Sequence, residues 1–186
     1  MHEPDEMVYR RYRANRGEDD LRLLFERYRE NLTLFLLNYV RHEEDAEDLM
    51  MEAFAVVAAC TSSFSGKSSF KTWLFAIGRN QACNFLRKRS RDSADRLAPA
   101  GQTEDAPEFE LLRKEENREL YRAMETLPDD YRQALYLLYF EQMSHDEACI
   151  VMRKTKGQMY NLVKRGRQAL RDALERMGYG ERWDMQ

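Results

Sequence analysis

Basic side chains gather in two stretches of this 186-residue chain that contain no acidic residue. One runs from Phe64 to Arg91 and the other from Val151 to Arg171, and each holds seven lysines and arginines. Blocks of one sign create a strong local potential even on a chain whose net charge is −3. The blocks therefore predict two contacts with a polyanion, although two solvated helix faces would have the same composition.

In the first block the cations alternate with aromatic rings and amides. Its members are Phe64, Lys67, Phe70, Lys71, Trp73, Phe75, Arg79, Asn80, Asn84, Phe85 and Arg87. Unpaired bases stack on exposed rings while positive charge follows the phosphate backbone, so the pattern favours a single-stranded nucleic acid. The alternative is that the rings belong to a core and the cations are solvated. We expect some rings to be buried and some to be exposed.

The second block follows a short helical segment and a turn, which together predict a helix-turn-helix. The inward face of its last helix is apolar, with Met159, Val163, Gly166 and Leu170 at helical spacing. The other face carries amides that can read adenine and cations that can read guanine or contact phosphate. An amphipathic basic helix that binds nothing remains the alternative.

A third segment, residues 43–52, is acidic. Its six acids are Glu43, Glu44, Asp45, Glu47, Asp48 and Glu52. This acidic block predicts a different partner, one with a basic surface. A solvated helix face is again the simpler alternative.

The elements that must position these residues are helices. Only 8 Gly and 4 Pro argue against a turn-rich β architecture. Apolar residues recur at steps of three and four, which predicts helices over residues 21–39, 46–57, 70–89, 109–126, 129–140, 144–152 and 155–177. Ser144 with Glu147 predicts a capping box, and Thr155 is expected to cap the last helix.

The fold class predicted is all-α, with two small helical domains joined by a flexible linker. The first domain is expected over residues 1–92 and the second over residues 110–178, followed by a tail at 179–186. Residues 93–109 are rich in acids and contain two prolines and a glycine, a composition typical of a linker.

Several classes of function are not supported by the residues. No apolar run approaches the roughly 20 residues of a membrane span, and the N-terminus lacks the apolar core of a secretory signal. The three cysteines are scattered, which predicts a reducing cytoplasm and no disulfide framework. His145 and Cys149 have no third ligand nearby, and no catalytic constellation is apparent. We expect no metal, no cofactor and no enzymatic activity.

Three segments, taken in order, resemble the extracytoplasmic-function (ECF) class of bacterial RNA polymerase sigma factors, of the sigma-70 family. They are DAEDLMMEAFAVV (45–57), FSGKSSFKTWLFAIGRNQACNFLRKRSR (64–91) and LPDDYRQALYLLYFEQMSHDEACIVM (127–152), the last followed by the basic helix. The resemblance covers about residues 20–90 and 110–176. It implies a region 2-like bundle and a region 4-like helix-turn-helix.

The resemblance also implies roles for residues. Contact with core RNA polymerase is expected at or beside Asp45, Asp48, Leu49, Glu52 and Phe54. The melted −10 strand of promoter DNA is expected to contact Phe64, Ser65, Lys67, Lys71, Arg79, Asn80, Asn84, Arg87, Lys88 and Arg89. The duplex −35 element is expected to contact Lys154, Thr155, Lys156, Gln158, Tyr160, Asn161, Lys164, Arg165 and Arg167. An anti-sigma factor is a further implied partner.

This chain departs from the family pattern in its last part. Arg153 and Lys154 stand in the helix-turn-helix turn where the family usually has a glycine and an apolar residue. Tyr160, Asn161 and Leu162 replace the usual basic-serine-arginine reading face, so an unusual −35 preference is expected.

The function expected from the resemblance is that of a sigma factor, which binds core polymerase and directs promoter-specific initiation. Two other functions fit parts of the sequence: a helix-turn-helix regulator that works without polymerase, and a helical interaction module without a nucleic-acid role. The acidic block and the aromatic-basic block favour the sigma factor, because a simple repressor needs neither.

Overall fold

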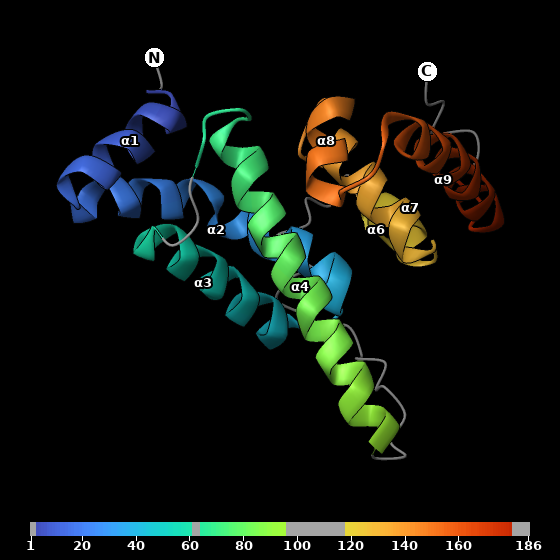
Figure 1. Cartoon of the computed structure of the whole chain (residues 1–186). Coiled ribbons are helices and arrows are strands. Elements are labelled where there is room, and N and C mark those ends of the chain that lie inside the picture. The colour runs from blue at the N-terminus through green and yellow to red at the C-terminus, as the bar shows by residue number, and fades with distance from the viewer. Residues whose placement is uncertain (1–2, 61–63, 96–117, 180–186) are drawn as a thin grey trace. The chain divides into compact units, whose positions relative to one another are not determined.

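The computed structural model describes residues 3–60, 64–95 and 118–179, and these residues form helices joined by short turns, with no strand among them (Figure 1). The all-α prediction is confirmed. In chain order the helices are α1 (Asp5–Asn15), α2 (Glu18–Val40), α3 (Glu43–Ala59), α4 (Phe70–Asp95), α6 (Arg118–Glu125), α7 (Asp129–Leu135), the π-helix η2 (Tyr136–Phe140), α8 (His145–Met152) and α9 (Lys156–Arg176).

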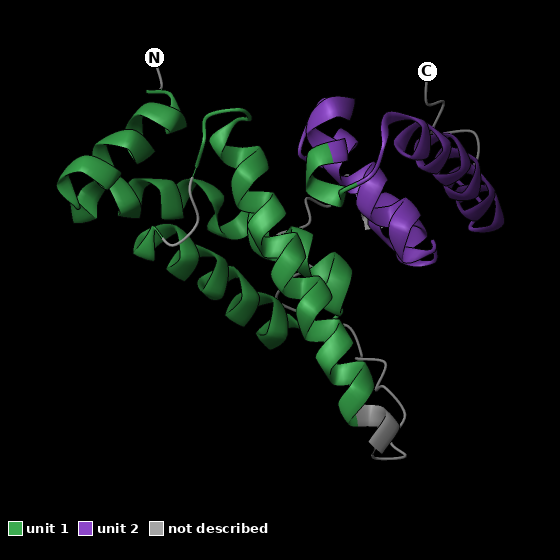
Figure 2. Cartoon of the chain, viewed as in Figure 1, with its two compact units in different colours: residues 1–101, 150–153 green, residues 102–149, 154–186 purple. Residues whose placement is uncertain are grey.

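The chain divides into two compact units, residues 1–101 with 150–153 and residues 102–149 with 154–186 (Figure 2). The expected linker, residues 93–109, lies outside the described residues except for its first three, which belong to α4. The expected tail lies outside them apart from Tyr179. The domain limits given above therefore stay a prediction.

In the first unit, α2, α3 and α4 pack on one another, and α1 packs on α2 and α4. The apolar stripe predicted for α3 is buried along its whole length, at Ala46, Leu49, Met50, Ala53, Phe54 and Val57. Leu32, Phe35 and Leu36 of α2 and Leu74 and Phe75 of α4 complete this core. The α3 stripe is thus used for packing, which leaves the acids of the same helix on its outer face.

Helix α1 was not among the helices predicted from the sequence. Its apolar contribution is small, because only Val8, Tyr9 and Tyr12 are buried. Three side chains over two turns are too few to produce a recognisable apolar stripe. Helix α1 ends at Arg16, which adopts a left-handed conformation with φ 54°.

In the second unit, the inward face predicted for α9 is buried at Met159, Val163, Gly166 and Leu170. A Cβ at Gly166 would lie 3.3 Å from Leu135 Cγ and 3.3 Å from Tyr131 Cβ, so glycine permits the close approach of α9 to α7. The sequence predicts one α-helix over 129–140, but its last five residues form η2. There Glu141 N–H donates to the Tyr136 carbonyl five residues earlier, at 3.1 Å.

Both predicted caps of the second unit are confirmed. Ser144 and Glu147 form the reciprocal box, with Ser144 N–H donating to Glu147 Oε2 at 3.0 Å and Glu147 N–H donating to Ser144 Oγ at 3.3 Å. Thr155 caps α9. Between α8 and α9, Arg153 occupies the turn with φ 51°. An arginine therefore holds the left-handed position for which glycine is best suited.

Candidate functional site

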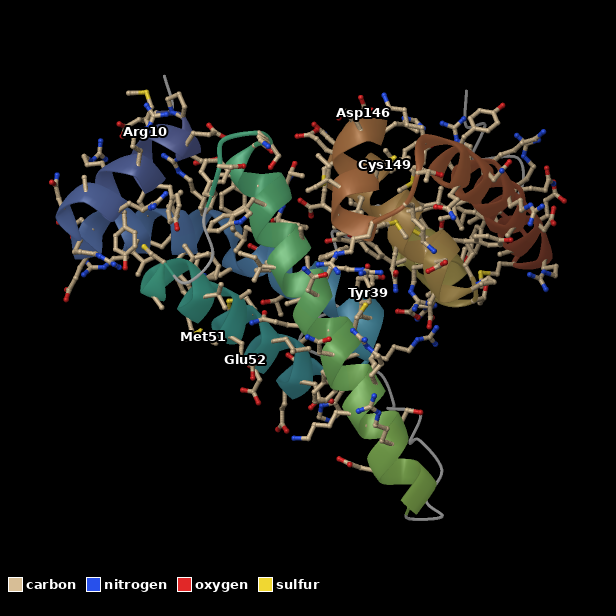
Figure 3. All side chains as sticks on the ribbon, viewed as in Figure 1. Arg10, Tyr39, Met51, Glu52, Asp146 and Cys149 are labelled. Atoms are coloured by element: carbon tan, nitrogen blue, oxygen red, sulfur yellow. The ribbon has the colours of Figure 1, made fainter. Side chains whose placement is uncertain are left out.

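The outer face of α3 is acidic. Asp48 and Glu52, expected as polymerase contacts, are exposed, as are Glu44 and Glu47. Met51 lies among them and is 54% exposed. Figure 3 shows Met51 and Glu52 side by side on this helix, with their side chains directed away from the ribbon. Met51 was not predicted as a contact, because it adjoins the apolar pair Leu49 and Met50, but its place one residue off the buried stripe marks it as outward-facing.

Two expected contacts on α3 are not surface residues. Leu49 and Phe54 are 3% and 5% exposed, and the Phe54 ring packs edge-on against Phe25 with centroids 5.0 Å apart. Both side chains belong to the stripe that holds α3 in the bundle. In the free chain they lie behind the acidic face and are not part of its surface; their expected place at or beside the polymerase contact stays a prediction.

Asp45 is partly buried and already paired. Its Oδ2 accepts from Arg89 Nη1 of α4 at 3.3 Å, and its backbone N–H donates to His42 Nδ1 at 3.5 Å. The ion pair joins a residue expected to contact polymerase with one expected to contact the −10 strand. Both side chains keep substantial exposure, 26% for Asp45 and 42% for Arg89, so the pair is weak and water-screened.

The loop before α4 presents small and basic groups around a left-handed glycine. Ser65, Gly66 and Lys67 are exposed, and Gly66 has φ 71°, which a residue with a Cβ rarely adopts. Phe64 lies at the described start of the loop and is half-buried, because its ring packs on Tyr9 and Trp73 at 5.8 and 5.3 Å.

The aromatic residues of the first basic block were expected to be partly buried and partly exposed, but none of them is fully exposed. Phe70 and Phe75 are buried, whereas Phe64, Trp73 and Phe85 are half-buried. The rings therefore contribute mainly to the core, and only three of them keep partial exposure to a ligand.

Helix α4 carries a continuous polar face. Asn80, Asn84, Arg87 and Lys88 follow the spacing of one helix face, and the last three are exposed. Arg87 Nη2 donates to Asn84 Oδ1 at 2.6 Å, which fixes both side chains on that face.

Two other cations of α4 lie closer to the core. Lys71 Nζ stands 5.7 Å from the centroid of the Phe75 ring. Arg79 is half-buried, and its Nε is buried with no hydrogen-bond partner among the described residues. A buried donor of this kind is costly unless satisfied, so Arg79 is a candidate for a contact made on binding.

The N-terminus of α9 is closed by a capping box that involves two expected DNA contacts. Thr155 Oγ1 accepts from Gln158 N–H at 3.3 Å, and Gln158 Oε1 accepts from Thr155 N–H at 2.9 Å. Bidentate reading of adenine by glutamine uses its carbonyl oxygen as well as its amide nitrogen. Gln158 Oε1 is therefore already engaged at the end of the helix.

Two lysines of the helix-turn-helix are paired with acids. Lys154 Nζ lies 2.9 Å from Asp130 Oδ2, and Lys156 Nζ lies 2.8 Å from Asp146 Oδ1. The hydrogen bond that Lys156 Nζ donates to the Asp146 carboxylate raises the pKa of Lys156, so its charge is maintained. Figure 3 labels Asp146, the acid of the second pair, on α8.

The remaining residues of the α9 surface are open to solvent. Tyr160 is 63% exposed, and Asn161, Lys164, Arg165 and Arg167 are also exposed. The Arg167 guanidinium lies 5.4 Å from the centroid of the Tyr139 ring, a cation–π contact that orients it. The outer face of α9 therefore offers amide, phenol and cationic donors within a few turns.

Within residues 3–60, 64–95 and 118–179, no group of three or more metal-ligating side chains occurs. Over those ranges no helix is long and apolar enough to cross a membrane either. Cys60, Cys83 and Cys149 are free thiols, and burial raises the pKa of Cys149.

Comparison with known proteins gives this geometry a family. The family model of sigma-70 region 2 matches residues 24–92, and the model of sigma-70 region 4 matches residues 117–170. The ECF RNA polymerase sigma factor SigX of Bacillus subtilis is 30% identical over 165 residues, which are 85% of each chain. This chain belongs to the ECF RNA polymerase sigma factors. The family expected from the three motifs is confirmed.

One further curated relative and two solved structures of the same fold are similar to this chain. The RNA polymerase sigma-H factor of Pseudomonas aeruginosa is 29% identical over 181 residues, 91% of this sigma factor and 93% of the relative. A solved structure of the sigma factor RpoE with the anti-sigma factor NepR from Bartonella quintana matches with a TM-score of 0.67 and 23% identity, covering 84% and 97% of the two chains. CnrH, solved with the cytosolic domain of CnrY, has the same TM-score at 19% identity, covering 92% and 97%.

The sigma factor is thus a transcription initiation factor, which binds core RNA polymerase and directs initiation at promoter DNA. The region 2 match contains α3, the 64–69 loop and most of α4, and the region 4 match contains α7, α8 and most of α9. A helix-turn-helix regulator without polymerase, and an interaction module without DNA, are therefore excluded as descriptions of the whole chain. Helix α1 lies outside both matched ranges.

Proposed function

We propose that three surfaces of this sigma factor divide the work of initiation: α3 docks on polymerase, the 64–69 loop and α4 hold the melted −10 strand, and α9 binds the −35 duplex. The chain itself catalyses no reaction, since RNA synthesis belongs to the core enzyme. It acts in the cytoplasm, where bacterial DNA and polymerase meet.

The observation that carries this proposal is the segregation of charge within the first unit. Asp48 and Glu52 are exposed on α3, whereas Arg87 and Lys88 are exposed on α4. Two surfaces of opposite sign on neighbouring helices suit two partners of opposite sign. One surface attracts a basic region of polymerase, and the other attracts the phosphates of a single strand.

On α3, Met51 would supply the apolar centre of the polymerase contact. An exposed methionine with acids on either side of it resembles the arrangement of a small interface, with a flexible apolar side chain inside a polar rim. The acids set the encounter rate and the register, and burial of Met51 adds contact area. Leu49 and Phe54 act indirectly by keeping the helix in place.

In the −10 surface, Ser65 and Lys67 are the groups proposed to contact bases. They are the exposed side chains of a short loop around Gly66. Arg87 and Lys88, further along α4, are proposed phosphate contacts, because they are exposed cations at the end of its polar face. Arg79 is a third proposed contact: its Nε–H, which is buried and has no partner among the described residues, would donate to a phosphate or base acceptor.

On α9, Asn161, Lys164 and Arg165 are proposed to read bases, and Lys154, Lys156 and Arg167 to contact phosphates. The readers are exposed on the outer face of the helix, and the lysines lie at its N-terminal end beside their acids. Since Gln158 is held in the capping box, Asn161 is the amide best suited to adenine.

A pair of charge variants tests the division between α3 and α4. Asp48→Lys with Glu52→Lys should weaken binding to purified core polymerase. The same double variant should leave the affinity for a pre-melted bubble template within the same order of magnitude. Arg87→Ala with Lys88→Ala should do the reverse. Glu30→Lys, at an exposed position of α2, is the matched control. Equal effects of both double variants on both ligands would refute the division.

An anti-sigma protein is a further proposed partner. The solved relatives RpoE and CnrH are described in complex with NepR and with the cytosolic domain of CnrY. Purification of the tagged chain from its own host, followed by identification of bound proteins other than polymerase, tests this proposal. Recovery of polymerase alone, under conditions where the regulon is silent, would count against it.

A further inference from the structure

Helix α1 touches both ends of the connection that leads from α3 to α4. It is the helix outside the family-matched ranges, and it packs on α2 and α4 (Figure 1). The connection carries Ser65, Gly66 and Lys67, which are the exposed residues of the proposed −10 loop. The polar side chains of α1 that enter this region make specific hydrogen bonds.

At the end of α3, one backbone carbonyl accepts hydrogen bonds from two side chains, one on α1 and one on the residue directly after it. Tyr12 Oη donates to the Ala58 carbonyl oxygen at 2.7 Å, and Arg16 Nη1 donates to the same oxygen at 2.8 Å. Carbonyls in the last turn of a helix have no partner within the helix, so these donors satisfy a group that would otherwise need water. Tyr9 Oη adds a weaker contact to Cys60 Sγ at 3.9 Å.

At the start of α4, a carboxylate from α1 acts as the cap. Glu6 Oε1 accepts from the backbone N–H of Phe70, the first residue of α4, at 2.8 Å. The first amides of a helix lack intrahelical partners, and a negative charge there also interacts favourably with the helix dipole. Ser69, the residue directly before α4, provides a local cap, because its Oγ accepts from Thr72 N–H at 3.2 Å, so Glu6 provides a second, long-range cap.

Between these two points, Tyr9 supports the described start of the loop. It is fully buried, and its ring lies 5.8 Å from that of Phe64, 5.2 Å from Phe70 and 5.2 Å from Trp73. The half-buried Phe64 is thereby held against α1 rather than left free in solution. Ser65 and Lys67 follow it directly in the chain.

We propose that Glu6, Tyr9 and Tyr12 are positioning residues for recognition of the −10 element, acting by fixing the ends of the loop that carries Ser65 and Lys67. This inference rests on the proposed function of that loop. A loop with fixed ends loses less conformational freedom on binding, so more of its contact energy discriminates between bases. Release of one end lowers that discrimination before it lowers the stability of the three-helix core.

The test is a selection on promoters with a randomised −10 element, transcribed by holoenzyme reconstituted with each full-length variant. Glu6→Ala removes the cap, whereas Glu6→Gln keeps an oxygen that can accept from Phe70 N–H. Loss of a helix cap shifts an equilibrium by roughly threefold to tenfold, so we expect Glu6→Ala to reduce enrichment of the preferred −10 sequence by about that factor. Glu6→Gln should restore most of it. Glu30→Ala on α2 is the control and should leave the profile unchanged.

The outcomes separate the possible failures. If Glu6→Ala lowers transcription from all −10 sequences by one common factor, its role is structural and the proposal is overturned. If Lys67→Ala leaves the −10 profile unchanged, the proposed function of the loop fails instead. Should Glu6→Ala prevent folding, Tyr12→Phe with Arg16→Met decides the question, because it removes both donors to the Ala58 carbonyl, and with them the Arg16 contact with the Tyr12 ring, while it keeps the aromatic ring and an apolar side chain in place. An unchanged −10 profile in that variant would also overturn the proposal.

Discussion

Gly166 provides a quantitative test of how closely α9 approaches α7. An alanine Cβ there would lie 3.3 Å from Leu135 Cγ and 3.3 Å from Tyr131 Cβ, whereas carbon atoms pack comfortably at about 3.5–4.0 Å. Neither neighbouring atom is the free end of a flexible side chain. Gly157 lies in the same helix, and a Cβ there would meet no atom within 4 Å. The substitution of glycine by alanine can therefore be compared at a closely packed position, Gly166, and at an open position, Gly157.

The expected magnitudes follow from that contrast. Replacement of glycine by alanine favours the helix by up to about 1 kcal/mol in a helix interior, such as position 166, and by less at Gly157, because it lies in the first turn of α9. At Gly166 this gain is opposed by overpacking, which destabilises by about 1–3 kcal/mol. Gly157→Ala should therefore raise the free energy of unfolding slightly, whereas Gly166→Ala should leave it unchanged or lower it by up to about 2 kcal/mol, because overpacking offsets or exceeds the gain in helix propensity.

Urea unfolding of the full chain, followed by circular dichroism, measures this difference for the transition of the second unit. Gly166→Val, which adds a branched side chain at the same contact, should destabilise more than alanine does. If both alanine variants are stabilised to the same extent, the close contact of α9 with α7 is absent and the support proposed for the DNA-binding helix is wrong.

Three further predictions concern DNA binding and stability. Lys156→Ala should weaken binding to all −35 duplexes alike and reduce the slope of log affinity against log salt concentration by about 1. Asn161→Ala should instead change which sequences are recovered from a randomised −35 pool. The opposite pattern would exchange the roles of the two residues. Arg153→Gly should raise the free energy of unfolding by up to about 1 kcal/mol, because it relieves a left-handed backbone with φ 51°, and a loss of stability would contradict this. The hydrogen bond from Arg11 lowers the pKa of Glu3 in the folded state. The contribution of this pair to stability is therefore present above the unfolded pKa of Glu3 and is lost as the pH falls through the lowered folded value. Glu3→Gln should reduce the dependence of the free energy of unfolding on pH in the acid range, and an unaltered dependence would show that the pair contributes nothing.

The helices that hold the site were predictable because their apolar residues repeat. All six residues of the α3 stripe and the four inward residues of α9 are buried as the periodicity indicated. Ser144 and Thr155 were recognisable as caps because the motif is local in sequence. Helix α1 was not predictable in this way, since its three buried residues depend on rings and carbonyls that come from α3 and α4.

Side-chain roles were less predictable than helices, for a physical reason. Residue type says what a side chain can do, but burial and existing partners decide what remains available. Phe54 is used by the core, Gln158 by a cap, and Asp45 and Arg89 by each other. Met51 shows the converse, because an apolar residue in an apolar run is left exposed on the acidic face.

The most direct test of the central claim, that this sigma factor directs polymerase through two separate DNA contacts, is run-off transcription from a library with randomised −35 and −10 elements. Purified core enzyme is assayed with and without the full-length chain, and the transcribed templates are sequenced. We predict transcripts that depend on the chain and an enriched motif with two parts at a fixed spacing. Chain-dependent transcripts without a −10 motif, or no transcription above that of core enzyme alone, would contradict the account.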